Sequence, residues 1–217
     1  MPNFHGQSEA AVCDLPQTRR GQERRLALLL SATTLFLERG YDAVSLDDVV
    51  HHAGGSKTSI YKYFGNKEGL FTAICDYRRN LFFKDICNTD VNESENLRCY
   101  LIDTLFNFYS HLRKAENVAF MRIIIEQTQR NADLALYIYE QGPKQIQTAT
   151  AQALANAHNK GILHCENPLH SAQLYFGILR DLEWRILMNI PIHEDDQEIY
   201  KYISYCVDRF LDGHQRV

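Results

Sequence analysis

Residues 56 to 67 concentrate hydrogen-bond donors in a chain whose formal net charge is -4. The donors are Ser56, Lys57, Thr58, Ser59, Tyr61, Lys62, Tyr63 and Lys67. Phosphate oxygens accept from hydroxyl, phenol and ammonium groups, and side chains near the start of a helix also read base edges in the major groove of DNA. The stretch therefore favours recognition of a polyanion. The same residue types also serve as ordinary helix caps and solvated surface groups, so a structural role stays open on the pattern alone.

Three helices must position these donors. Apolar residues recur at helical spacing between Gly21 and Gly40, which predicts the first helix. Ser45 then caps a short second helix that ends at Gly54. The polar segment before the first helix, residues 1–18, is expected to be flexible.

The third predicted helix is only about two turns long and exposes most of its side chains. Ser56 caps it, and Ile60 and Phe64 form its apolar face at i, i+4 spacing. Ser45, Ser56 and Asn66 each sit at a helix start, where free N–H groups favour an anion. Two short helices joined by a glycine turn predict a helix-turn-helix.

The charge is distributed unevenly along the chain. Residues 1–80 hold 10 Lys and Arg against 9 Asp and Glu, whereas residues 81–217 hold 13 against 18. An acidic whole argues against non-specific coating of nucleic acid. Any contact with a polyanion must therefore be local and close to the N-terminus.

Three blocks of residues follow one another between residues 20 and 75. They are Arg25-x-x-Leu28-Leu29-x-Ser31-Ala32-x-x-Leu35-Phe36-x-x-x-Gly40-Tyr41, Ser45-Leu46-Asp47-Asp48-Val49-Val50-x-x-Ala53-Gly54 and Ser56-Lys57-x-Ser59-Ile60-Tyr61-x-Tyr63-Phe64-x-x-Lys67-Glu68-x-Leu70-Phe71. This ordered series resembles the N-terminal domain of TetR-family transcriptional regulators.

The resemblance implies that Ser45, Tyr63 and Lys67 hold phosphates of double-stranded operator DNA. It also implies that Lys57, Thr58, Ser59, Tyr61 and Lys62 lie in or beside the major groove, and that Arg19, Arg20 and Arg24 form an arm that reaches the backbone or minor groove.

Two residues depart from the pattern of that family. Gly55 stands where the family usually has a hydrophobic residue, commonly valine, so a contact with the core is missing and the turn is expected to be more flexible. Thr58 replaces a frequent glycine or alanine at the start of the recognition helix. We expect Thr58 to alter which base is read.

The remaining two-thirds of the chain shows helical patterns throughout. Helices are expected over residues 96–113, 117–127, 132–160, 169–189 and 193–212, with the third interrupted at Gly142-Pro143 and a polar connector at 85–96. The predicted fold is all-α, with about nine helices. A three-helix DNA-binding domain at 19–66 precedes a larger helical ligand-binding and dimerisation domain at 67–217.

The last two predicted helices carry more apolar surface than one face requires. The resemblance implies that they pair two subunits in a four-helix bundle, which places two recognition helices about 34 Å apart on DNA. Closing the core of a single subunit is the alternative role for the same residues. The predicted dimer residues are Leu174, Tyr175, Ile178, Leu182, Ile199, Ile203, Cys206 and Phe210.

Aromatic residues between these regions predict a cavity for a small-molecule effector. The predicted lining residues are Phe106, Phe108, Tyr109, Phe120, Ile123, Ile124, Tyr137, Tyr139, Phe176 and Trp184, with His111, Gln127 and Arg180 as polar contacts. The stretch FMRIIIEQTQRNADLALYIYEQGP also resembles the C-terminal domain of a TetR subgroup that includes multidrug-efflux repressors such as AefR and NalC. This resemblance implies an apolar or amphipathic effector, or control of efflux genes.

Other chemistry finds little support in the sequence. The six cysteines form no C-x-x-C pair, and the histidines show no regular ligand spacing, so no metal site is expected. No G-x-S-x-G, P-loop or H-E-x-x-H motif is present, so neither an enzyme nor a cofactor is expected. No apolar run is long enough to span a bilayer and no secretory signal precedes the helices, which predicts a cytoplasmic protein without a membrane partner.

The sequence thus predicts a ligand-responsive, homodimeric repressor released from its operator by a small molecule. A dimeric ligand-binding or interaction protein whose DNA-binding head has degenerated is the alternative, in view of Gly55 and the acidic balance.

Overall fold

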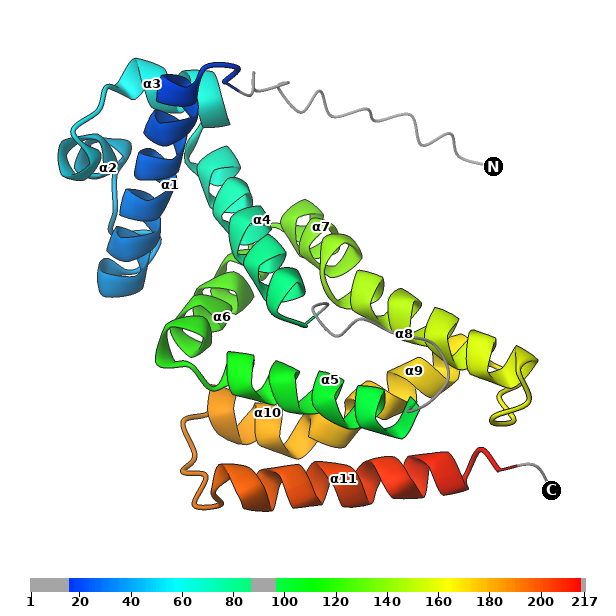
Figure 1. The fold of residues 1–217 in the computed structure, drawn as a ribbon. Helices are drawn as coiled ribbons and strands as arrows, with labels where there is room; N and C mark the ends of the chain where they lie inside the picture. The colour runs from blue at the N-terminus through cyan, green and yellow to red at the C-terminus, as the bar shows by residue number, and fades with distance from the viewer. Residues whose placement is uncertain (1–15, 87–96, 216–217) are drawn as a thin grey trace, which may run out of the picture. The chain divides into compact units, whose positions relative to one another are not determined.

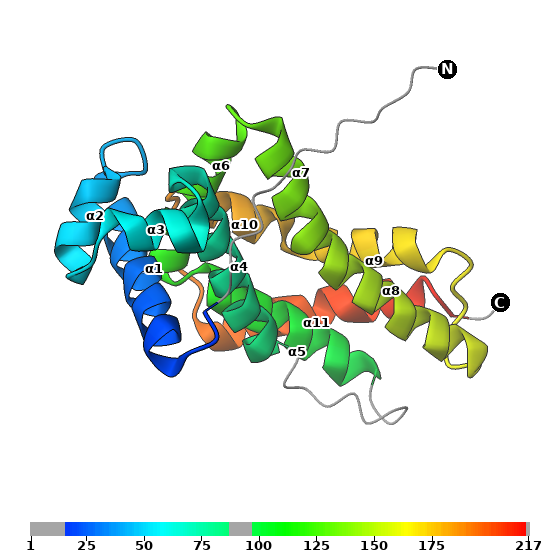
Figure 2. The ribbon, with the colours of Figure 1, turned by 90° about the horizontal axis from the view of Figure 1, so that it is seen from above.

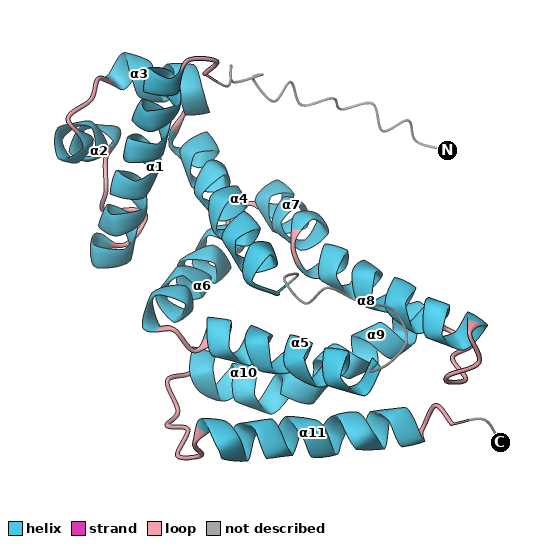
Figure 3. Cartoon of the chain, viewed as in Figure 1, coloured by secondary structure: helices cyan, strands magenta, loops and turns pink. Residues whose placement is uncertain are grey.

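The computed structural model describes residues 16–86 and 97–215 of the chain. Over these residues it is helical and contains no strand (Figures 1 and 3). The helices are α1 (Arg19–Arg39), α2 (Leu46–Ala53), α3 (Lys57–Phe64), α4 (Lys67–Ile86), α5 (Leu97–Leu112), α6 (Ala115–Thr128), α7 (Ala132–Gln141), α8 (Pro143–Asn159), α9 (Pro168–Phe176), α10 (Arg180–Leu187) and α11 (Asp196–Asp212), with a 3-10 turn, Gly177–Leu179, between α9 and α10.

The predicted all-α class is confirmed. If α7 with α8 and α9 with α10 are each counted as one interrupted helix, the described residues form nine, the number predicted. Most of the predicted flexible segment (residues 1–15) and of the predicted connector (87–96) lies outside the described residues.

The described residues pack into two units that divide within α4, between Arg78 and Arg79. The domain boundary predicted between residues 66 and 67 falls at the start of this same helix. Helix α4 is thus the covalent link through which the chain passes from one unit to the other.

The first unit is built on α1, α2, α3 and the beginning of α4. Its core consists of apolar side chains from all four helices and from the loop before α2: Leu28, Leu29, Ala32, Leu35, Phe36, Val44, Val49, Ile60, Phe64, Leu70, Phe71 and Ile74. Glycines end the helices where the backbone needs a positive φ, at 80° for Gly40 and 66° for Gly54. The helix boundaries predicted from these glycines are therefore confirmed.

The basic residues predicted to form an N-terminal arm belong to helix α1, and their contact with DNA stays a prediction. Thr18 caps α1, since its side-chain oxygen accepts a hydrogen bond from the backbone N–H of Gly21 at 3.2 Å. Arg19 and Arg20 lie in the first turn of α1, and Arg24 lies in the second. Because the cap starts the helix before the basic residues, these side chains project from a helix and not from an extended segment.

The core of the second unit is formed by α5, α6, α8, α9, α10 and α11, and α7 contacts α6 and α8. Helices α5 and α11 run antiparallel, because Arg98 near the start of α5 pairs with Asp208 and Arg113 beyond its end pairs with Asp196. Helices α8 and α9 form a hairpin, and Figure 2 shows them side by side. Leu101, Tyr175 and Ile203, from α5, α9 and α11, are fully buried in this core.

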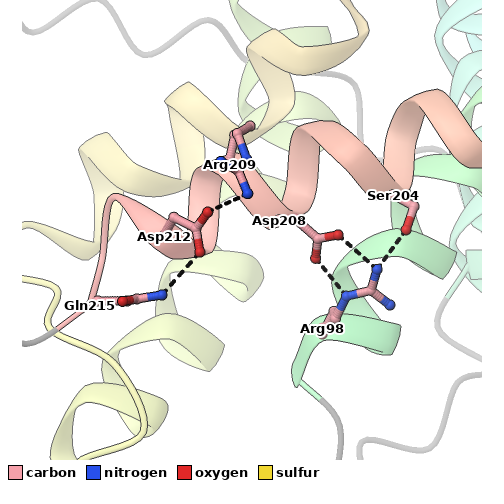
Figure 4. A network of polar contacts seen from close by, with 6 residues as sticks. All are labelled: Arg98, Ser204, Asp208, Arg209, Asp212 and Gln215. Carbon is pink, nitrogen blue, oxygen red and sulfur yellow. Dashed lines mark hydrogen bonds and ion pairs between the residues drawn. The ribbon is translucent and has the colours of Figure 1, made fainter.

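A surface network ties α11 to α5 (Figure 4). The Arg98 guanidinium donates to both carboxylate oxygens of Asp208, at 2.6 and 2.9 Å, and to the Ser204 hydroxyl at 2.7 Å. The pair raises the pKa of Arg98 and lowers the pKa of Asp208. At the end of α11, Asp212 accepts from Arg209 and Gln215.

Two interruptions divide the longer helical patterns. The predicted break at Gly142-Pro143 is confirmed, since α7 ends at Gln141 and α8 begins at Pro143. The predicted helix at 169–189 is corrected, because the 3-10 turn at Gly177–Leu179 separates α9 from α10. Glycine has a low helix propensity, and the helix backbone near it can adopt the tighter i, i+3 hydrogen-bond pattern. No proline or polar cluster in the sequence signals this change.

Candidate nucleic-acid interface

Helix α3 presents polar side chains on an exposed surface. Ile60 and Phe64 are its buried residues, as predicted. Lys57, Thr58, Tyr61 and Lys62 are exposed, while Ser59 and Tyr63 are partly buried. An eight-residue helix with only two buried side chains contributes little to the core, so its remaining groups are available to a ligand.

The caps of α2 and α3 use hydroxyls that were predicted to bind DNA. Ser56 accepts a hydrogen bond from the backbone N–H of Ser59 at 3.4 Å. Ser45 forms a capping box with Asp48: the hydroxyl accepts from the Asp48 N–H at 3.1 Å and donates to the Asp48 carboxylate at 2.5 Å. These bonds lower the pKa of Asp48. A phosphate at Ser45 must therefore replace a carboxylate as the acceptor of this hydroxyl.

Lys57, which was predicted to face the major groove, is paired with an acid. The Lys57 ammonium group lies 2.8 Å from a carboxylate oxygen of Asp47 on α2, and this pairing raises the pKa of Lys57. Both side chains are at least half exposed, so the pair is open to exchange with another anion.

The predicted phosphate ligands Tyr63 and Lys67 contact opposite ends of α1. The Lys67 ammonium group lies 4.3 Å from the ring centroid of Tyr41 and 5.9 Å from that of Phe36, near the C-terminal end of α1. The Tyr63 hydroxyl lies near Gly21 in the first turn, where an added Cβ would be 3.6 Å away. Gly21 and Phe36 are separated by roughly 22 Å along the helix. The two side-chain tips are therefore too far apart to bind the same phosphate.

Burial changes the titration of the groups around Lys67. Desolvation lowers the pKa of Lys67, opposed by the carboxylates of Asp42 and Asp48. Burial, with the nearby Glu68 and Asp42, raises the pKa of Tyr41 to about 12. Tyr41 is therefore neutral near pH 7 and offers its ring face to a cation.

Two arginines of α1 approach α3. The Arg25 guanidinium stacks over the Phe64 ring at 5.0 Å. Arg24 is exposed, and its guanidinium lies beside Gly55, in the turn between α2 and α3. The contacts of Asp47, Asp48 and Arg25 were not predicted from the sequence. The capping-box spacing from Ser45 to Asp48 was a local signal for one of them, but the other two contacts join separate helices.

The predicted effector-lining residues do not share one environment. Tyr109 and Phe120 are buried, and Phe106, Ile124 and Phe176 are partly buried. Tyr137, Arg180 and Trp184 lie at the exposed surface, where the Arg180 guanidinium is 5.6 Å from the Trp184 ring centroid. The last two therefore form a surface pair in the isolated chain and do not line an enclosed cavity.

A group of partly buried rings gathers in the second unit. Phe82 at the end of α4 contacts Phe108 of α5 at 5.5 Å and His111 at 4.7 Å between ring centroids. Phe108 contacts Phe176 of α9 at 6.4 Å. We call Phe82, Phe108, His111 and Phe176 the aromatic cluster. Phe108, His111 and Phe176 are among the predicted lining residues, whereas Phe82 is not.

Most of the predicted dimer residues belong to the core of the single chain. The hydroxyl of Tyr175, for example, donates to the Leu101 carbonyl at 2.6 Å. These side chains fill the alternative role, the core of a single subunit, because α5 covers them on α9 and α11. The buried members are Tyr175, Leu182, Ile199, Ile203 and Phe210, whereas Leu174 is 65% exposed and Ile178 and Cys206 are partly buried.

A different set of apolar side chains is exposed on α10, on α11 and in the segment between them. Tyr202 and Tyr205 lie one helical turn apart on α11, together with the partly buried Cys206. On α10 and just beyond it, Trp184, Met188 and Ile190 are also exposed. With Leu174, these six exposed residues are called the apolar face.

The described residues were also compared with the requirements of a metal site and of a membrane-spanning helix. Among residues 16–86 and 97–215, no three His, Cys, Asp or Glu side chains are grouped so as to hold a metal ion. Within the same ranges, no helix combines the length and apolar character needed to cross a membrane.

Two protein-family models match the chain. The model for bacterial regulatory proteins of the tetR family matches residues 28–74. The model for the C-terminal domain of AefR-like transcriptional repressors matches residues 100–215. Together they include the helix-turn-helix and nearly all of the second unit.

Individual transcriptional regulators are also similar to this chain in sequence. The HTH-type transcriptional activator FasR of Mycolicibacterium smegmatis is 32% identical over 92 residues, which are 41% of this chain and 42% of FasR. In that match the chain spans less than half of its relative. The HTH-type transcriptional regulator YezE of Bacillus subtilis, itself uncharacterized, is 30% identical over 155 residues, 68% of this chain and 77% of YezE.

Solved structures match over nearly the whole chain. A TetR-family regulator from Mesorhizobium loti superposes with a TM-score of 0.82 at 23% identity, covering 92% of this chain and 100% of its own. The flavonoid-responsive regulator FrrA superposes with a TM-score of 0.78 at 26% identity, covering 89% and 97%. The first likeness establishes the fold alone.

Proposed function

The chain belongs to the tetR family of bacterial regulatory proteins, and we propose that it is a homodimeric repressor that binds operator DNA through α2 and α3. In this proposal a small apolar or amphipathic molecule binds the second unit and releases the DNA. The observation that carries the proposal is the exposed polar surface of α3, where Ile60 and Phe64 are the buried residues.

DNA binding at this surface is an exchange of ion pairs. Lys57 is held by Asp47 and the Ser45 hydroxyl by Asp48, so phosphates must compete with two carboxylates. Both acids are near the surface, and competition between exposed groups involves a small free-energy difference. We therefore expect specific binding to depend strongly on salt and on the remaining donors of α3.

The apolar face supports the homodimer. Exposed apolar patches of this kind mark protein interfaces, and a second copy offers the same patch to a two-fold axis. Leu174, Trp184 and Tyr205 are each at least half exposed in the isolated chain. A two-fold pair presents two α3 helices to successive major grooves, as operator half-sites require.

The aromatic cluster supports an aromatic effector. Its rings are partly buried, and aromatic side chains are a usual lining of small-molecule sites. FrrA, a structural relative, is flavonoid-responsive, which favours the same ligand class. Control of a multidrug-efflux operon is supported only by the resemblance to efflux repressors and by the AefR-like family match.

Helix α4 suits the role of a connection between the two events. It carries Lys67 at its first residue and Phe82 of the aromatic cluster near its end. A ligand that binds better to the form with low DNA affinity must weaken DNA binding by that difference in affinity, and DNA must weaken ligand binding equally.

A gel-shift titration tests the DNA-binding part. The probe is the intergenic duplex upstream of the protein's own gene, and the Tyr63→Ala/Lys67→Ala double variant is compared with wild type. Loss of phosphate contacts should weaken binding to all sequences together, whereas Thr58→Ala should change the preference among them. Lys114→Ala, an exposed charge on the second unit, is the matched control.

Unchanged retardation of the Tyr63/Lys67 double variant would contradict the assignment of the phosphate contacts. Absence of retardation by wild type on this and on randomised duplexes would instead favour the degenerate-head alternative. Effectors are then sought by release of bound duplex with flavonoids, dyes, antibiotics and fatty acids.

A further inference from the structure

The turn between α2 and α3 contains two glycines with different physical roles. Gly54 has a φ of 66°, a left-handed conformation that favours glycine. Gly55 is not among the residues with positive φ, so its backbone accepts other residues without strain. The reason for a glycine at position 55 must therefore be space and not conformation.

The space above Gly55 is occupied by Arg24. A Cβ added at Gly55 would lie 3.7 Å from Nη2 and 3.8 Å from Nε of Arg24, and 3.3 Å from Cδ2 of Leu28. A single methyl group thus fits with a small movement of Leu28. A branched side chain would extend beyond that Cβ and compete with the guanidinium for the same position.

The charge of Arg24 is unpaired at this position. The side chain is exposed, and within residues 16–86 and 97–215 it forms no ion pair. The neighbouring Lys57, in contrast, is paired with Asp47. An exposed guanidinium beside the turn that precedes α3 is well suited to a bidentate contact with a phosphate group.

We propose that Arg24 binds a DNA phosphate beside the start of α3, and that Gly55 positions it by leaving this space open. The inference rests on the proposed DNA-binding function and extends it. The proposal also explains why glycine replaces valine at position 55. Glycine gives up an apolar contact with Leu28 and leaves room for the Arg24 side chain of α1 to reach DNA.

Binding of Arg24 and Gly55 variants to one duplex tests the proposal. The probe is a duplex selected with the wild-type homodimer from a random 30-base-pair library, and affinity is measured by fluorescence anisotropy from about 0.05 to 0.2 M salt. Each homodimer carries two copies of Arg24, so its loss removes two phosphate contacts. The magnitude of the slope of log K against log salt should therefore fall by about 1.8, which corresponds to about sixtyfold weaker binding at 0.1 M salt. Arg24→Ala and Gly55→Val should each show this loss.

The double variant Arg24→Ala/Gly55→Val separates the two roles. If valine acts by displacing Arg24, the double variant binds no more weakly than Arg24→Ala alone. Gly55→Ala, which adds only the Cβ, should remain within about twofold of wild type. Lys114→Ala removes one exposed charge from the second unit and should leave the slope unchanged.

Each outcome decides a separate statement. A wild-type protein that retains no duplex overturns the DNA-binding function and this inference with it. Wild-type binding with an unchanged Arg24→Ala slope overturns the inference alone. Losses that add in the double variant, or an unaffected Gly55→Val, overturn the role of Gly55. Should Gly55→Val melt below the assay temperature, Arg24→Ala and Arg24→Lys still decide the phosphate contact, because Arg24 is an exposed side chain.

Discussion

Leu174 and Tyr175 are adjacent residues on α9 whose roles must differ sharply. Tyr175 is fully buried and its hydroxyl donates to the Leu101 carbonyl at 2.6 Å, whereas Leu174 is 65% exposed. Burial raises the pKa of Tyr175, so the hydroxyl remains a neutral donor. We predict that Tyr175 variants lower the stability of the fold and that Leu174 variants weaken the dimer.

The magnitudes follow from these contacts. Tyr175→Phe removes one buried hydrogen bond and should lower the free energy of unfolding by about 1 kcal/mol. Tyr175→Ala also leaves a cavity and should lower it by about 3–5 kcal/mol. Leu174→Ser removes an exposed apolar group that two-fold symmetry uses twice, so the dimer dissociation constant should rise at least about tenfold.

Urea titrations at several protein concentrations, combined with analytical ultracentrifugation, measure both effects. Concentration must be varied because dimerisation contributes to apparent stability. Tyr175→Phe should shift the urea midpoint equally at every concentration and leave the dimer constant unchanged. A Tyr175→Phe protein with unaltered unfolding and weakened dimerisation would refute the argument, as would a Leu174→Ser dimer of wild-type affinity.

Three further variants test individual charges. Pairing with Arg185 lowers the pKa of Glu194 to about 2 from 4.5, so the stability it contributes is present above 4.5 and lost as the pH falls toward 2; Glu194→Gln should flatten the pH dependence of the urea midpoint in that window, and an unchanged acid limb would contradict this. Asp47→Asn frees Lys57 for phosphate and should tighten duplex binding in anisotropy titrations, whereas weaker binding would mean that the pair orients the lysine for DNA. Arg98→Ala should lower the melting temperature more at low salt than at high salt, and an equal loss at both would exclude an electrostatic contribution.

Some polar contacts of the helix-turn-helix join residues that are neighbours in the sequence, and others join separate helices. The capping of α2 by Ser45 and of α3 by Ser56 was predictable, because a cap and its helix are neighbours in sequence. The Asp47–Lys57 pair and the approach of Arg24 to Gly55 were not, since each joins residues brought together only by the packing of separate helices. The start of α1 was predicted at Gly21 and lies at Arg19 for a local reason, since Thr18 was not recognised as the cap of this helix.

Local sequence signals were sufficient to predict the helical class, the glycines that end the helices of the first unit and the break at Gly142-Pro143. Helical periodicity, capping and proline geometry all act within one or two turns. Whether an apolar side chain of α9 or α11 faces the core or the surface depends on how these helices pack against others. Tyr175 and Leu174 are both apolar enough to be buried, and the position of α5 against α9 and α11 selects between them. Periodicity marks an apolar face on a helix, but it carries no information on which neighbour covers that face.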